Sequence, residues 1–142
     1  MYFFPLSPMQ KVLIVDDNDR YATNLKVYLD RLKIESVRAI SAREGFDFFL
    51  REPFTAVITD ITMESQISGL ILVRKIFKLG YKGKLIIATT GFDVFGVMSL
   101  GKYLLPIYGG VGWMIPKVPL KRGEVLFFPT YGNHILNPFE IQ

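Results

Sequence analysis

Lys11-Val-Leu-Ile-Val-Asp16-Asp17-Asn-Asp19 is the stretch of sequence that decides the fold. Four apolar residues, Val12 to Val15, run directly into two adjacent acids. A short apolar run that is closed by polar residues is typical of a fully buried strand in a parallel sheet. Open α/β sheets place their ligand sites at the carboxyl ends of such strands. Because two carboxylates repel each other unless a cation lies between them, Asp16 and Asp17 predict a cation site.

The rest of the chain alternates strand and helix patterns. Helical periodicity begins near Asn18 or Asp19, and Ser41-Ala-Arg-Glu44 has the spacing of a capping box. The patterns predict strands at 11–15, 35–40, 55–60, 85–89 and 112–115, and helices at 19–32, 42–50, 69–79 and 93–105. Such alternation with right-handed crossovers implies an α/β fold, a doubly wound parallel five-stranded sheet with helices on both faces.

Composition favours one packed domain, which we expect to span residues 1–142. Half of the 142 residues are hydrophobic and none is cysteine, which excludes disulfides and thiolate metal sites. The net charge is +4, but the basic residues are scattered, so we expect no nucleic-acid partner. The nearly uncharged span 94–115 contains Lys102, Pro106 and five glycines, so we expect no membrane insertion. The N-terminus is a poor signal peptide, and we expect a cytoplasmic protein.

Polar side chains follow four of the five predicted strands. Asp16 and Asp17 end the first strand, Asp60 the third, Thr90 the fourth and Lys117 the fifth. In a doubly wound sheet these ends share one edge, so the side chains can converge. Carboxylates are ligands for Mg²⁺, and a carboxylate can also attack phosphorus to give an acyl phosphate. A lysine and a hydroxyl can then bind the phosphoryl oxygens.

Over about residues 10–120 this set resembles the receiver domain of bacterial two-component response regulators, in particular the stand-alone, chemotaxis-regulator-like kind. The matching pieces are Val-Leu-Ile-Val-Asp16-Asp17, Ala-Val-Ile-Thr-Asp60-Ile-Thr-Met63, Leu-Ile-Ile-Ala-Thr-Thr90-Gly and Lys117. Each motif alone has little specificity, but all four occur in order, each at a strand end, and together they are specific. The resemblance implies a flavodoxin-like sheet with strand order 2-1-3-4-5.

The resemblance also implies a role for each residue of the site. Asp60 would be the phosphoacceptor, taking a phosphoryl group from a sensor histidine kinase or a phosphotransfer protein. Asp16, Asp17, Asp60 and the backbone carbonyl of Thr62 would hold Mg²⁺. Thr90 would be the switch hydroxyl, with the adjacent Thr89 as its rival, and Lys117 would pair with the phosphoryl group. Such a protein is a signalling switch rather than an enzyme, capable at most of slow self-dephosphorylation.

The chain departs from the family pattern at several positions. Glu64 stands where the family usually has proline, and the loop from there to Gly69 is one residue longer than expected. Val118 separates Lys117 from Pro119, which puts the family's cis peptide bond in doubt. Met114 stands where the family often has an aromatic residue, and strand alternation places its neighbour Trp113 on the opposite face.

The segment 121–142 diverges most from the family. It contains helix breakers in place of a charged amphipathic helix, which leaves room for only a short helical turn at 124–128 before Pro129. The final helix is therefore in doubt. His134, the single histidine, lies among such breakers, and we expect neither a phosphodonor nor a metal role for it.

Other interpretations of the same residues stay open. Asp17 could be a helix N-cap, and Lys117 alone could be a solvated surface residue. The altered loop and Lys117-Val-Pro119 suggest an alternative function, a receiver-like protein-interaction module with weak or lost phosphorylation switching. Two enzyme classes are disfavoured: an aspartate-nucleophile phosphatase would need an acid at Thr62, and no Gly-x-Gly-x-x-Gly follows the first strand to bind a dinucleotide.

The region 92–115 is rich in apolar residues for a helix that should lie at the surface. The residues concerned are Phe95, Val97, Met98, Leu100, Tyr103 and Leu104. A patch of this kind usually marks an interface, and in the family the corresponding face meets an output domain or a second copy. We therefore expect a homodimer or a tightly bound protein partner at this region.

Overall fold

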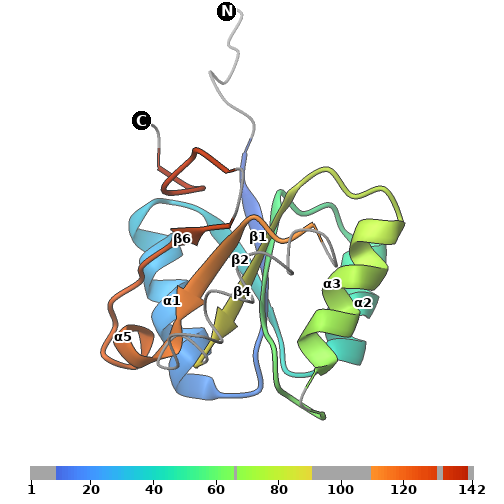
Figure 1. Cartoon of the computed structure of the whole chain (residues 1–142), viewed down its shortest axis with the longest axis horizontal. Coiled ribbons are helices and arrows are strands. Elements are labelled where there is room, and N and C mark those ends of the chain that lie inside the picture. The colour runs from blue at the N-terminus through green and yellow to red at the C-terminus, as the bar shows by residue number, and fades with distance from the viewer. Residues whose placement is uncertain (1–8, 66, 91–109, 131–132, 141–142) are drawn as a thin grey trace, which may run out of the picture.

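The computed structural model describes residues 9–65, 67–90, 110–130 and 133–140. Its centre is a six-stranded sheet with the order β2-β1-β3-β4-β5-β6. The strands are β1 (Lys11–Val15), β2 (Glu35–Ala39), β3 (Ala56–Asp60), β4 (Lys84–Thr89), β5 (Trp113–Pro116) and β6 (Phe128–Pro129). The first five strands are parallel, and β6 pairs with β5 in the antiparallel direction (Figure 1).

Helices cover both faces of this sheet (Figure 1). Helices α1 (Asp19–Arg31) and α5 (Lys117–Lys121) lie on one face, and α2 (Ala42–Arg51) and α3 (Ser68–Lys78) lie on the other. The central strand β1 is buried on both sides, since Val12 and Ile14 pack toward α1 while Leu13 and Val15 pack toward α2 and α3. Burial on both sides explains the continuous apolar run in its sequence.

The helix starts agree with the local sequence. The Asn18 side chain accepts hydrogen bonds from the backbone N–H groups of Arg20 and Tyr21, so Asn18 is the N-cap of α1. Asp17 does not take that role, and the N-cap interpretation of Asp17 is wrong. At α2 the Ser41 hydroxyl accepts from the N–H of Glu44, as the capping-box spacing predicts.

The fold class predicted from the sequence is confirmed. All five predicted strands form with their ends shifted by no more than one residue, and the strand order is 2-1-3-4-5 before β6 is added. Trp113 and Met114 lie on opposite faces of β5, as alternation predicts. The described residues include no cis peptide bond. The predicted helix at 93–105 and the interface at 92–115 lie outside the residues that the structure describes, apart from the stretch from Gly110 onward.

The segment after α5 differs from the sequence prediction. The predicted helical turn at 124–128 is wrong, because residues 124–127 form neither helix nor turn and lead into β6, which pairs Phe128 with Met114 and Pro129 with Trp113. The described residues 133–140 lie against β5, where the Trp113 indole N–H donates to the carbonyl of Ile135 over 2.8 Å. Phe127 and Phe139 pack edge to face beside α1, with ring centroids 5.7 Å apart. Aromatic side chains from the segment after α5 thus pack beside α1, in the part of the chain where the sequence left a final helix in doubt.

Within the described part of the chain, no helix combines the length and the apolar character needed to cross a bilayer.

Candidate functional site

Three acids meet at the carboxyl edge of the sheet. Asp16 and Asp17 follow β1, and Asp60 is the last residue of β3, which pairs directly with β1. One carboxylate oxygen from each residue lies within 4.8 Å of the other two. Asp16 and Asp60 are buried, with exposed fractions of 1% and 4%, whereas Asp17 faces solvent. Parallel pairing of two strands that both end in an acid therefore brings together the carboxylates that the sequence singled out.

The Asp16 carboxylate is only partly satisfied by its surroundings. Its Oδ1 accepts a hydrogen bond from the N–H of Asn18 over 2.9 Å, while its Oδ2 is buried without a hydrogen-bond partner among the described residues. Burial raises the pKa of this carboxyl to about 6; the Asn18 N–H and Lys117 oppose the rise, and the charges of Asp60 and Asp17 add to it. An orphaned oxygen beside two further carboxylates is a donor set suited to a hard cation such as Mg²⁺.

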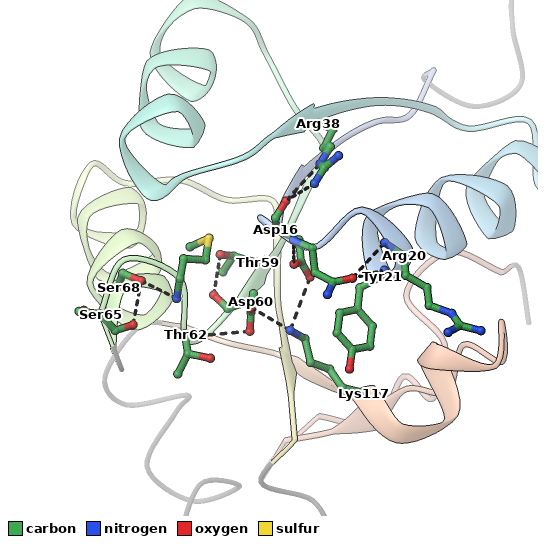
Figure 2. Close-up of polar contacts among 12 residues, drawn as sticks. Asp16, Arg20, Tyr21, Arg38, Thr59, Asp60, Thr62, Ser65, Ser68 and Lys117 are labelled. Carbon is green, nitrogen blue, oxygen red and sulfur yellow. Dashed lines mark hydrogen bonds and ion pairs between the residues drawn. The ribbon is translucent and has the colours of Figure 1, made fainter.

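Lys117 brings a positive charge into this cluster. It follows β5 as the first residue of α5, and only 6% of it is exposed. Its Nζ lies 2.8 Å from Asp60 Oδ2 and 3.7 Å from Asp16 Oδ2 (Figure 2). A solvated surface role for Lys117 is therefore wrong: the side chain is buried between two carboxylates. With three acids and one lysine, the cluster keeps a net negative charge when all four groups are ionised.

The threonines predicted for the site are less buried than Asp16, Asp60 and Lys117. Thr90 follows β4 and is exposed, and no hydrogen bond joins it to Asp60 within the described structure. Thr89, the rival candidate, is the last residue of β4 and is half-buried. The Thr62 N–H lies 3.3 Å from Asp60 Oδ1 and donates a long hydrogen bond to it. The roles predicted for the Thr90 hydroxyl and the Thr62 carbonyl stay predictions.

Two residues at the site had no role in the sequence prediction. The Arg38 guanidinium on β2 donates to the carbonyl of Asp16 through Nε and Nη2, over 3.1 and 3.0 Å, and pairs with Asp19 through Nη1. The Tyr21 ring on α1 lies beside Lys117, whose Nζ is 4.3 Å from the ring centroid (Figure 2). The sequence signal for Tyr21 was its position in the first turn after the acid pair; Arg38 carried no signal beyond the end of a predicted strand.

Glu64 has a defined structural role in the loop after Asp60. Its Oε1 accepts a hydrogen bond of 2.8 Å from the N–H of Ala42, at the N-terminus of α2. A carboxylate at that position interacts favourably with the positive end of the helix dipole. The loop ends where Gly69 passes so close to β3 that a Cβ would lie 1.7 Å from the carbonyl oxygen of Asp60. Only glycine fits there.

Comparisons with known proteins all point to response regulators. The family model for the response regulator receiver domain matches residues 12–99. The response regulator protein PilR of Pseudomonas aeruginosa is 37% identical over 67 residues, which are 47% of this chain and 15% of PilR. The chain thus matches a small part of that longer relative.

Solved receiver structures share the fold. A response regulator receiver domain from Clostridium thermocellum is 26% identical and aligns with a TM-score of 0.63 over 81% of this chain and 90% of that one. The Thermotoga maritima response regulator TrrA, solved in complex with Mg²⁺ and BeF, is 24% identical and aligns with a TM-score of 0.59 over 71% of this chain and 82% of that one. Because the family model covers more than half of the residues, this chain belongs to the response regulator receiver domain family of two-component signalling.

Proposed function

We propose that this receiver domain is a phosphoacceptor switch in which Asp60 takes a phosphoryl group from a histidine kinase or phosphotransfer protein in the cytoplasm. One observation carries the proposal: Asp60, buried at the end of β3, has the Lys117 ammonium 2.8 Å away and two further carboxylates within 4.8 Å. A buried acid with a cation and a candidate metal site beside it is equipped to hold an acyl phosphate, whose charge would otherwise be costly at that depth.

The transfer forms one bond and breaks another. An Asp60 carboxylate oxygen bonds to phosphorus while the P–N bond of the phosphohistidine breaks, and the imidazole nitrogen leaves with the electron pair. Lys117 would move its hydrogen bond from the carboxylate to a phosphoryl oxygen, and a hydroxyl from Thr90 would donate to another. The added negative charge is the signal that changes the surface presented to partners.

The acid cluster also fits a magnesium ion. Asp16, Asp17 and Asp60, together with the Thr62 carbonyl, are the groups that would hold it, and the orphaned Asp16 Oδ2 is the oxygen left for it in the described structure. When bound, Mg²⁺ supplies positive charge for the phosphoryl oxygens. Arg38 keeps the backbone at Asp16 in place for this role through its two hydrogen bonds.

The proposal is tested by labelling with acetyl phosphate in the presence of Mg²⁺. Wild type is expected to acquire one acid-stable, base-labile phosphoryl group, and Asp60→Asn none. Asp30→Asn, a change to an exposed residue of α1, is the matched control and should label like wild type. Labelling that survives in Asp60→Asn would remove Asp60 from the role. Wild type that never labels, but binds a protein partner regardless, would favour the interaction-module alternative.

The proposed output contact rests on the apolar sequence of residues 92–115. A homodimer there should appear in light scattering as a mass near twice 16.2 kDa. A strict monomer, with and without phosphodonor, would contradict the homodimer and leave a separate protein as the partner.

A further inference from the structure

The Lys117 ammonium is enclosed from two sides by different chemistry. On one side are the carboxylates of Asp60 and Asp16, at 2.8 and 3.7 Å. On the other is the face of the Tyr21 ring, with its centroid 4.3 Å from Nζ (Figure 2). An aromatic face attracts a cation, and the attraction grows when the cation is withdrawn from water. The ring therefore takes the place of water on the side of the ammonium that no carboxylate covers.

Tyr21 is itself held firmly. Its backbone N–H donates to the Asn18 side chain, which fixes it in the first turn of α1 directly after the acid pair. Its ring packs against the core between α1 and the sheet. Farther along α1, the Asn24 side chain donates to the carbonyl of Leu120 in α5 over 2.7 Å, so the two helices that carry Tyr21 and Lys117 are tied together.

A lysine side chain has four rotatable bonds, and it loses much conformational freedom when it is fixed in one place. Without the ring, the ammonium could turn outward to water and leave the two carboxylates unpaired. We propose that Tyr21 is a positioning residue that keeps the Lys117 ammonium against Asp60 and Asp16, and so sets the rate at which Asp60 accepts a phosphoryl group. The rate part of this inference rests on the proposed function.

Lys117 can be followed directly by NMR, without phosphorylation. Protons above an aromatic ring resonate upfield, so the Hε protons of Lys117 in ¹³C-lysine-labelled protein should be shifted upfield relative to the other lysines. Tyr21→Phe keeps the ring and should keep this shift. Tyr21→Leu keeps an apolar side chain without a ring and should lose it. Unshifted Lys117 protons in wild type would overturn the proposal without requiring any variant to fold.

Acetyl phosphate labelling then tests the consequence for phosphoryl transfer. Tyr21→Leu should be labelled about fivefold to thirtyfold more slowly than wild type, the range expected between a partly exposed and a desolvated cation–π contact, and Tyr21→Phe at nearly the wild-type rate. A wild-type rate in Tyr21→Leu, together with loss of the ring-current shift, would show that the ring does not set the rate and would overturn the proposal.

Magnesium affinity separates positioning from general damage to the site. In Tyr21→Leu the displaced ammonium no longer competes for Asp16 and Asp60, so calorimetric titration should give Mg²⁺ binding at least as tight as in wild type. Weaker Mg²⁺ binding, with slower labelling, would mean that the substitution merely disrupts the site, which contradicts the proposal. Wild type that takes up no phosphoryl group would instead overturn the proposed function, while the wild-type NMR shift would still test the contact of the ring with Lys117 and the titration would still test whether Tyr21 positions the ammonium.

Discussion

Asp16 carries a buried carboxylate oxygen that has no hydrogen-bond partner in the described structure. Burial raises the pKa of its carboxyl from 3.8 to about 6, so near neutral pH the folded protein holds a buried charge that is only partly compensated. The sign of the effect on stability follows from linkage. The unfolded chain releases this proton at lower pH than the folded chain does, so stability falls as the pH rises from about 4 to about 6 and stays reduced above that range.

Asp16→Asn should therefore stabilise the metal-free protein at pH 8. The pKa shift corresponds to at most about 3 kcal/mol, and the amide keeps the oxygen that accepts from Asn18. The gain in free energy of unfolding should fall below about 1 kcal/mol as the pH is lowered to 4, where Asp16 is protonated in the folded state and lies near its ordinary pKa of 3.8 in the unfolded chain. Urea denaturation in EDTA at both pH values measures it, with Asp30→Asn as control. An equal gain at both pH values would show that the buried charge is not the cause.

At the scale of single residues, the sequence predicted the charged groups of the site. It did not predict the aromatic ring beside Lys117 or the contact of Glu64 with a backbone N–H group. Asp16, Asp17, Asp60 and Lys117 could be found because each follows a strand, and parallel strands end at a common edge. The contact between Tyr21 and Lys117 depends on how α1 lies over α5, which no local pattern specifies. The contact of Glu64 with the N-terminus of α2 joins residues 22 positions apart through an irregular loop, so the sequence showed Glu64 only as a departure.

Among the elements, the segment after α5 is the one whose structure differs most from the sequence prediction. Helix α5 has five residues, and the chain then runs through β6 into the stretch 133–140. The hydrogen bonds that anchor the segment after α5 join it to distant parts of the chain. The Lys84 ammonium donates to the carbonyl of Pro138, the Asn137 side chain donates to the Tyr28 hydroxyl, and the Thr130 hydroxyl donates to the carbonyl of Val111.

Phe139→Ala should destabilise the whole domain by about 3 kcal/mol, because the ring is 6% exposed and packs against Phe127 and the core beside α1. Leu136→Ala removes a side chain that is 65% exposed and should change the free energy of unfolding by less than about 0.5 kcal/mol. Trp113 is the single tryptophan, and its indole N–H bonds to Ile135, so its fluorescence reports on this segment.

Denaturation followed by Trp113 fluorescence and by far-UV circular dichroism should give coincident transitions in wild type and in Phe139→Ala. A fluorescence change that precedes the loss of secondary structure would mean that the segment detaches alone and does not stabilise the sheet.

Local sequence could predict that no long helix forms in the segment after α5, but not that the segment pairs with the edge of β5. Gly123, Pro129 and Pro138 exclude a long helix, and that inference from the residues agrees with the five-residue α5. Strand β6 contains only two residues, one of them proline, and forms because the free edge of β5 accepts it. Proline is tolerated at a sheet edge, where its missing N–H need not bond to a neighbour. Such a strand is defined by its partner and leaves no periodicity to detect.

For the molecule as a whole, the two cores on either side of the sheet determine where charge can be placed. The central strands β1 and β3 are buried along almost their whole length, so the acids at their carboxyl ends are carried to one edge of the sheet. The whole chain has a net charge of +4, whereas the cluster of Asp16, Asp17, Asp60 and Lys117 is negative. Because salt screens charges beyond about 8–10 Å, the local charge governs what binds at the edge.

Mg²⁺ should therefore stabilise the whole domain despite its positive net charge. An ion that binds the folded protein and not the unfolded chain adds about 2.7 kcal/mol to the free energy of unfolding when its free concentration is 100 times Kd. Thermal unfolding in EDTA and in Mg²⁺ measures the gain, which should be lost in Asp60→Asn and kept in Asp30→Asn. Since Lys117 already neutralises part of the cluster, Lys117→Met should be less stable than wild type in EDTA and gain more from Mg²⁺. Equal stabilisation of Asp60→Asn and wild type would place the ion elsewhere on the molecule.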